Sequence, residues 1–141
     1  MFICDISIWD RYGKQLLDKR LLSFGLDWRE MIILLVIERE SGLLQTRLIP
    51  FLQTDKANVT KVLQSMEAKG LIIRTQDPAD HRSKRCHHTD SGRALLPELH
   101  RVMKSWTAEC FEGISVDELD VYRQVGDKLS ENMVKKVRSG Q

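Results

Sequence analysis

Two short stretches of this sequence carry side chains suited to contact nucleic acid. The first runs from Lys56 to Lys61 and includes Ala57, Asn58 and Thr60. Asn and Lys can hydrogen-bond to base edges, Lys and Thr can bind phosphates, and Ala permits close approach. The second, His81-Arg82-Ser83-Lys84-Arg85, is a short basic run, and arginine suits the negative potential of a narrow minor groove. Together they make double-stranded DNA the first candidate partner.

The charge around these stretches has a mild basic bias. Between Thr54 and Arg93 the sequence has eight Lys or Arg against five Asp or Glu. The net charge of the whole chain is only +2, so the local distribution is more informative than the total. This bias is compatible with phosphate contact and does not by itself establish it.

The cysteines and histidines give weaker indications of chemistry. Cys4, Cys86 and Cys110 are an odd number at wide spacing without a CxxC pair, which favours free thiols over a disulfide framework or a thiolate zinc site. In Cys86-His87-His88, residues of a strand alternate between its two faces, so Cys86 and His88 can converge while His87 cannot. Two ligands are too few for a closed site, so we expect no metal and no cofactor.

An enzyme is not indicated. The sequence contains no Ser-His-Asp pattern, no phosphate-binding loop and no pair of acidic residues placed to share a site. A module that binds only proteins is a better alternative. A contact surface lined with acidic residues would favour that alternative, and the stretch from Lys56 to Lys61 has none.

The composition is that of an ordinary globular protein. Apolar residues make up 42% of the 141 residues and charged residues 30%, which excludes a disordered chain and allows one domain with its own core. The longest apolar run, Met31 to Ile37, is far shorter than the roughly 20 residues that cross a bilayer. The first residues also lack a basic region followed by an apolar stretch. We therefore expect a single domain over residues 1–141, located in the cytoplasm.

Hydrophobic spacing predicts that helices position these residues. Apolar residues recur at helical spacing over about 5–22, and a second helix, capped by Asp27 and apolar almost all round, follows. A third segment, 45–52, contains Pro50, which removes an amide donor and predicts a short or irregular helix.

The next segment is an amphipathic helix followed by strands. Asp55 or Thr54 is a suitable N-cap, and Gly70 is a typical C-terminal signal. An apolar stripe seats this helix on the core: Val59, Val62, Leu63 and Met66. Residues 71–73 then form a short β-type run and 83–88 a polar second strand, so we expect a thin two-stranded hairpin.

Two long helices are predicted after the hairpin. Thr89 caps the first, in which Pro97 is expected to introduce a bend. Ser115 and Glu118 form a capping box for the second, whose apolar residues keep close to a heptad spacing up to about residue 137.

The order of these elements is typical of a winged helix-turn-helix protein: mainly α, with a small β-hairpin wing. We place the winged helix-turn-helix core at about 27–90 and dimerisation helices at about 5–22 and 90–137. The helix that begins near Asp55 would then enter a major groove, and the hairpin tip would reach an adjacent minor groove.

Four ordered motifs resemble the MarR family of transcriptional regulators: Val59-Thr60-Lys61, Glu67 to Ile72, Asp77 to Lys84, and Thr89 to Leu95. The resemblance extends over essentially the whole chain. It implies a homodimer joined through the first, fifth and sixth helices. It also implies a palindromic operator and repression relieved by a small ligand or an oxidant. Asp80 and Arg82 match the family's Asp-x-Arg wing motif, in which Asp holds Arg and Arg contacts DNA.

The predicted DNA-binding residues combine both lines of argument: Lys56, Ala57, Asn58, Thr60, Lys61, Asp80, Arg82 and Lys84. The sequence also departs from the family pattern. Leu44 stands where a polar N-cap is common and Pro50 where a small helical residue is. Cys86 and His88 occupy places in the second wing strand that are usually aliphatic and should face inward.

Two ways of relieving repression remain open. The aromatic residues Trp9, Tyr12, Trp28 and Trp106 are candidates to line a pocket for a small aromatic effector, although aromatics on such faces are more often core. Cys4 lies about where the hydroperoxide-sensing branch of the family has its reactive cysteine, and a helix N-terminus favours the thiolate. The tyrosines of that branch are missing near Leu17 and at Trp28, so we prefer the ligand.

Overall fold

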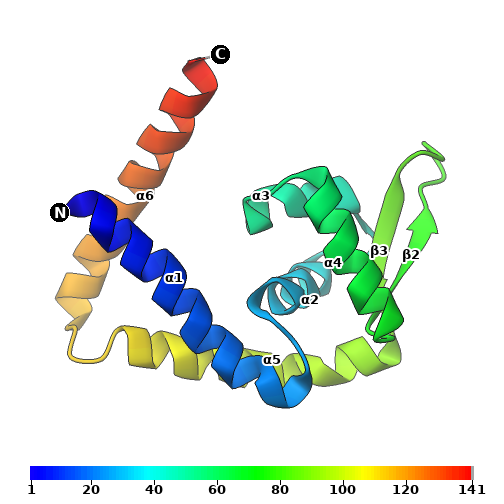
Figure 1. Cartoon of the computed structure of the whole chain (residues 1–141), viewed down its shortest axis with the longest axis horizontal. Helices are drawn as coiled ribbons and strands as arrows, with labels where there is room; N and C mark the ends of the chain where they lie inside the picture. The colour runs from blue at the N-terminus through cyan, green and yellow to red at the C-terminus, as the bar shows by residue number, and fades with distance from the viewer. Residues whose placement is uncertain (141) are drawn as a thin grey trace. The chain divides into compact units, whose positions relative to one another are not determined.

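The computed structural model describes residues 1–140 and divides the chain into two compact units, Met1–Thr107 and a second unit that begins at Ala108 (Figure 1). The first unit opens with α1 (Phe2–Leu21) and a 3-10 turn (Leu22–Phe24). The helix predicted over 5–22 is therefore confirmed and begins three residues earlier.

The central helix α2 (Trp28–Arg39) begins as its sequence predicts. Asp27 is the N-cap, and its carboxylate accepts hydrogen bonds from the backbone N–H groups of Arg29 and Glu30. The Glu30 carboxylate in turn accepts from the backbone N–H of Asp27, which completes a capping box. The helix is the middle of the core, with four side chains fully buried: Met31, Ile33, Leu34 and Ile37.

The segment with Pro50 is short and irregular, as predicted. It consists of a 3-10 turn (Gln45–Leu48) and the single-turn helix α3 (Ile49–Leu52). Leu44 precedes it without a side-chain capping bond. Gln53 then adopts the left-handed conformation, with φ of 48°. This reversal leads into α4 (Lys56–Ala68), which is capped by Asp55 and followed by Gly70 at φ of 71°.

The predicted two-stranded hairpin is confirmed, and among the described residues a third strand that the sequence did not predict joins it. The strands β2 (Ile72–Gln76) and β3 (Lys84–His88) pair antiparallel, and β1 (Leu43–Leu44) adds to the other edge of β3. Leu43 pairs with Cys86, and the N–H of Gly42 donates to the Cys86 carbonyl. A strand of two residues is too short to give a periodic pattern.

The middle strand β3 has the alternation expected of it. Cys86 is fully buried, and burial raises the pKa of its thiol to about 11. His88 also turns inward, and its Nε2 lies 2.8 Å from the carbonyl oxygen of Leu34 in α2. His87 lies on the other face, with its Nε2 3.2 Å from the Thr75 hydroxyl.

The helix α5 (Asp90–Cys110) starts against the wing. The Thr89 hydroxyl donates to the Gly70 carbonyl and accepts from the N–H of Gly92, while the N–H of Thr89 donates to the Leu71 carbonyl. The start of α5 is therefore bonded to the chain that enters β2. Pro97 lies inside the helix.

The second unit contains α6 (Val116–Ser139), which begins with the predicted capping box of Ser115 and Glu118. None of its described side chains is buried. No helix within residues 1–140 is both long enough and apolar enough to cross a membrane.

Candidate nucleic-acid interface

The N-terminal half of α4 presents a small, polar surface. The predicted stripe of Val59, Val62, Leu63 and Met66 is buried against the core. The opposite side leaves the following side chains exposed: Lys56, Ala57, Asn58, Lys61 and Gln64. The structure therefore brings the predicted residues of this helix together on one open face.

The polar side chains of this face differ in how free they are. The Asn58 amide lies 3.3 Å from the carboxylate of Asp55, the N-cap residue. Thr60 is half-buried, and its hydroxyl already donates to the Lys56 carbonyl, 2.9 Å away. Lys56 and Lys61 are exposed.

At the wing tip, Asp80 organises the turn. One carboxylate oxygen accepts from the backbone N–H of Arg82, 3.0 Å away, and the other from the Ser83 hydroxyl at 3.0 Å. The bond to Arg82 is to its main chain, so Asp80 fixes the backbone of that residue. The side chains of Arg82 and Lys84 are exposed.

Two arginines outside the predicted DNA-binding set, Arg85 and Arg74, form ion pairs that brace the wing. Arg85 binds the Asp77 carboxylate at 3.0 Å and the Gly42 carbonyl at 2.8 Å. The hydrogen bond from Arg85 to Asp77 holds the pKa of the Asp77 carboxyl below its usual value. Arg85 therefore joins the wing to the chain entering β1.

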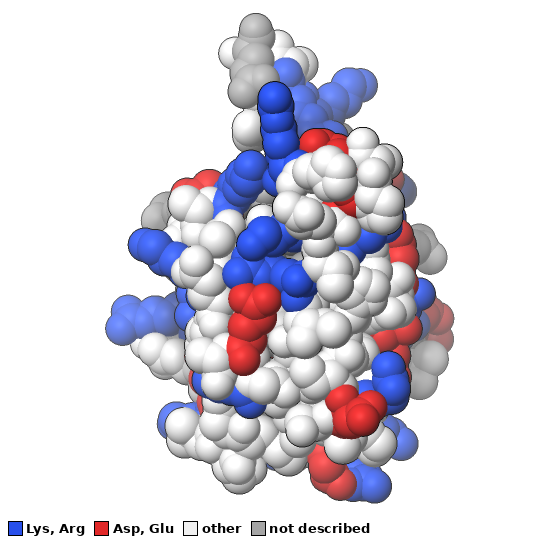
Figure 2. Space-filling model, turned by 90° about the vertical axis from the view of Figure 1, so that its right-hand side faces the viewer, with Lys and Arg blue, Asp and Glu red and all other residues white. Residues whose placement is uncertain are grey.

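Arg74 makes the second brace. Its side chain is 93% buried and binds Glu67 of α4 at 2.6 Å and the Gln45 amide oxygen at 3.3 Å. The hydrogen bond from Arg74 lowers the pKa of Glu67. Acidic and basic side chains also abut near the centre of the face drawn in Figure 2.

Pairing divides the basic residues between Thr54 and Arg93 into two groups. Four form ion pairs: Lys69 with Glu30, Arg74 with Glu67, Arg85 with Asp77, and Arg93 with Asp90. Within residues 1–140, the other four have no ion-pair partner: Lys56, Lys61, Arg82 and Lys84. These four are the basic residues predicted from the sequence to bind DNA.

A hollow of about 170 Å³ lies between α2 and α4. Arg29 and Glu30 of α2 line it, together with Asn58, Lys61 and Ser65 of α4. It is bordered by charged and polar groups and adjoins the exposed face of α4.

The four candidate effector residues lie in different environments. Trp9 and Tyr12 are exposed on α1, at 61% and 57%. Trp28 is half-buried with the Lys14 ammonium 4.5 Å from its ring centre, and the Trp106 indole N–H donates to the Gly13 carbonyl at 2.9 Å. None of the four lines the hollow between α2 and α4.

The remaining candidate groups are placed as follows. Cys4 and Cys110 are exposed free thiols. His100 binds Glu38, with 2.8 Å between its Nε2 and the carboxylate. Across the described residues, no three His, Cys, Asp or Glu side chains are arranged to hold a metal ion.

These elements define the winged helix-turn-helix class. They are a short helical segment, a reversal of the chain, an amphipathic helix with an open polar face, and a small sheet with a basic tip. Comparison with known proteins finds similarity to one family of this class. The sequence profile of the MarR family matches residues 24–83, which is less than half of the chain.

Individual proteins of this kind are also similar to the chain. A Bacillus subtilis protein described as the uncharacterised HTH-type transcriptional regulator YkoM is 40% identical over 63 residues, and the match covers 45% of this chain and 41% of YkoM. A MarR transcriptional regulator from Methanosarcina mazei is 26% identical, with a TM-score of 0.84 over 95% of this chain and 97% of that one.

A second similar structure contains DNA. It is a Listeria monocytogenes protein, described as a MarR-family transcriptional regulator and crystallised with a 26mer DNA. It is 22% identical, with a TM-score of 0.86 over 99% of this chain and 95% of that one. At this identity the likeness concerns the fold.

Proposed function

We propose that this chain is a homodimeric, sequence-specific DNA-binding repressor that recognises a palindromic operator. The observation that carries the proposal is the group of four basic residues without an ion-pair partner, two on α4 and two on the wing. Because a paired arginine or lysine loses the pairing energy when it turns to a phosphate, unpaired ones bind DNA at lower cost.

The DNA complex of the Listeria protein supports the same use of this fold. In this proposal α4 enters the major groove, where Ala57, Asn58 and Lys61 face the bases and Lys56 faces a phosphate. Arg82 enters the adjacent minor groove while Asp80 fixes its backbone, and Lys84 binds a flanking phosphate.

Exposed apolar side chains support the dimer. On α1, Phe2, Ile3, Ile8 and Trp9 are 48–61% exposed. On α6, a longer set is 37–74% exposed: Val121, Tyr122, Val125, Leu129, Met133, Val134 and Val137. Apolar surface of this extent is typical of an interface, and a two-fold dimer reads two half-sites about one helical turn apart. Sedimentation as a monomer at micromolar concentration would contradict the dimer.

A titration with two kinds of DNA tests the proposal. The first probe is the duplex immediately upstream of the protein's own reading frame, and the second is a shuffled duplex of equal length and composition. We expect the first to bind more tightly, with an affinity that falls steeply with salt. Equal affinity for both duplexes, or none for either, followed by failure to enrich any sequence from a random library, would refute sequence-specific binding.

Variants separate the two contact surfaces. Arg82→Ala should weaken binding by roughly 1–3 kcal/mol, and Lys61→Ala should weaken it and alter the preferred sequence. Arg101→Ala is the matched control, because Arg101 is an exposed basic residue on α5 away from both surfaces. An Arg82→Ala protein that binds like the control would refute the role of the wing.

Relief of repression by a small aromatic ligand near Trp28 and Trp106 is the preferred form of regulation, with oxidation of Cys4 as the alternative. Treatment of wild type and Cys4→Ser with an organic hydroperoxide distinguishes them. Release of DNA in wild type alone would establish the redox route. If neither protein releases DNA, a screen of aromatic acids for loss of DNA binding and for quenching of tryptophan fluorescence tests the ligand.

A further inference from the structure

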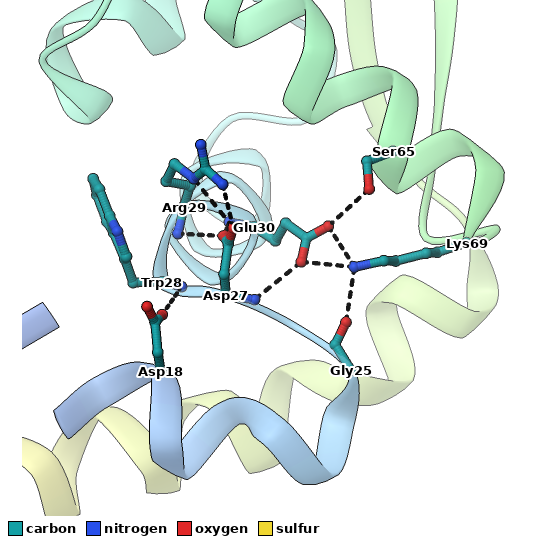
Figure 3. A network of polar contacts seen from close by, with 8 residues as sticks. All are labelled: Asp18, Gly25, Asp27, Trp28, Arg29, Glu30, Ser65 and Lys69. Carbon is teal, nitrogen blue, oxygen red and sulfur yellow. Dashed lines mark hydrogen bonds and ion pairs between the residues drawn. The ribbon is translucent and has the colours of Figure 1, made fainter. Parts of the chain in front are cut away.

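An ion pair between a buried carboxylate and a partly exposed ammonium connects three segments of the first unit at the C-terminal end of α4 (Figure 3). The Glu30 side chain is 5% exposed, and its two carboxylate oxygens lie 2.7 and 2.9 Å from the Lys69 ammonium. The same ammonium donates to the Gly25 carbonyl at 2.8 Å. We call this arrangement the Glu30–Lys69 bridge.

The bridge is fully bonded. The three N–H donors of the Lys69 ammonium match three acceptors, two on Glu30 and one on Gly25. Glu30 also accepts from the backbone N–H of Asp27 at 3.0 Å and from the Ser65 hydroxyl at 3.4 Å. Each end of the contact is therefore fixed in direction as well as in distance.

Stability alone does not explain such a pair. Glu30 is removed from water and Lys69, whose side chain is 39% exposed, is removed in part, and this loss of hydration offsets much of their attraction. An apolar pair of similar size is therefore often about as stable. Apolar contacts, however, are non-directional and allow neighbouring elements to shift, whereas charge-assisted hydrogen bonds do not. What the bridge adds over an apolar pair is a defined position for the elements that it joins.

Those elements include the proposed recognition helix. Lys69 is the C-cap of α4, Glu30 lies in the first turn of α2, and Gly25 ends the turn that follows α1. At 1.5 Å per residue, the N-terminal end of α4 lies about 20 Å from Lys69, so a tilt of about 10° there moves Lys56 by roughly 3 Å. A hydrogen bond to a base edge does not survive a displacement of that size.

We propose that Glu30 and Lys69 are positioning residues for DNA recognition, which hold α4 at a fixed angle to α2 and to the end of α1. This proposal rests on the DNA-binding function proposed above. The bridge contributes to selective binding and little to nonspecific binding, because phosphate contacts tolerate small shifts of a helix better than base contacts do.

The decisive variant replaces both charges with apolar side chains of similar length, Glu30→Met with Lys69→Met. We expect its urea unfolding midpoint to match that of wild type. Its affinity for the preferred duplex should fall about 10-fold or more, while its affinity for a shuffled duplex changes less than about 2-fold. The single variant Lys69→Arg, which retains the charge and the donors, should keep most of the selectivity of wild type.

The matched control is Glu40→Gln with Arg47→Gln. That pair lies 2.5 Å apart and is also formed between α2 and a later segment, but its side chains are 49% and 58% exposed. We expect the control to keep the selectivity of wild type. An unchanged ratio of affinities in the double-methionine variant would overturn the proposal. If that variant does not fold, Glu30→Gln, which retains the size of the side chain, is measured in its place with the same criteria.

Amide hydrogen exchange measured without DNA tests whether the bridge fixes α4, independently of the proposed DNA-binding function. In the double-methionine variant, amides of residues 25–30 and 65–70 should exchange faster together, while those of the α5 core keep their protection. If exchange in both segments is unchanged, the bridge does not fix α4 and the proposal fails. If exchange changes as expected but wild type prefers no DNA sequence, the DNA-binding function fails and the bridge remains.

Discussion

Substitution of Gly92 by alanine should be one of the most destabilising small changes in this protein. Gly92 lies in the first turn of α5, where the helix starts against the chain entering β2. A Cβ atom built on Gly92 overlaps the Leu71 carbonyl oxygen and lies 3.0 Å from its carbon. Both neighbours are backbone atoms, so the helix itself must move away from the sheet.

The size of the effect follows from what that movement breaks. Overpacking of a tight contact costs roughly 1–3 kcal/mol. The displacement also strains the bond from the Thr89 N–H to Leu71, at 3.1 Å, and the bond from the Thr89 hydroxyl to Gly70, at 2.6 Å. Each is worth about 1 kcal/mol. Alanine regains at most about 1 kcal/mol of helix propensity, so we expect a net loss of roughly 2–4 kcal/mol.

Gly13→Ala is the matched control. Gly13 also lies inside a helix, but a Cβ atom there meets the Trp106 ring at 3.7 Å, an ordinary contact distance. The control should be neutral or more stable by up to about 1 kcal/mol, because only the propensity term remains.

Urea unfolding of both variants at one protein concentration measures the difference, since the stability of the proposed dimer would depend on concentration. The Gly92→Ala curve should shift to a lower midpoint with an unchanged slope. If Gly92→Ala unfolds within about 0.5 kcal/mol of wild type, the close approach of α5 to Leu71 is not present in solution.

Three further predictions concern single residues. Gln53→Gly should be more stable in urea than Gln53→Ala by roughly 1 kcal/mol, because Gln53 has a φ of 48° that glycine adopts more easily than alanine. Both variants lose the 2.6 Å bond to the Pro50 carbonyl, so Gln53→Ala, which also keeps the strain, should be less stable than wild type. Equal stability of the two variants would contradict the strain at Gln53. Burial lowers the pKa of His88, and Arg93 adds to this, while the Leu34 carbonyl and Glu38 oppose it. Its neutral form is therefore favoured in the fold, so the stability it contributes is complete above its unfolded pKa of about 6.5 and is lost as the pH falls through the folded value. His88→Gln should lose less stability than wild type between pH 7.5 and pH 5, and equal pH profiles would contradict this. In native protein a thiol-alkylating reagent should label Cys4 and Cys110 and spare Cys86, because Cys86 is buried and its pKa is raised to about 11; mass spectrometry showing equal labelling would refute the buried position.

The sequence was sufficient for features that depend on near neighbours. The caps at Asp27, Asp55 and Ser115 each lie within three residues of the groups that they bind, so their residue types alone predict them. The short helix at Pro50 and the inward direction of Cys86 follow from equally local rules.

Features that join distant segments could not be predicted in this way. The pairing of β1 with β3 depends on Leu43 meeting Cys86, and two residues carry no alternation from which to infer it. The Arg85 brace to Gly42 and the Glu30–Lys69 bridge join residues separated by 43 and 39 positions. Nothing in the type of a charged residue tells whether it will meet a partner or remain free.

The ion pairs of residues 54–93 change what the charge count of this segment implies. In sequence, residues 54–93 carry only a mild excess of basic residues. In the fold, Glu67, Asp77 and Asp90 each bind an arginine, and Asp55 and Asp80 accept bonds from backbone N–H groups. The acidic groups of this segment are thus held by neighbours, while four basic groups form no ion pair within residues 1–140. Substitutions should therefore fall into two classes. Loss of Lys56 or Lys84, which face phosphates in the proposed complex, lowers affinity for every sequence and the steepness of its salt dependence, whereas loss of a brace lowers selectivity first.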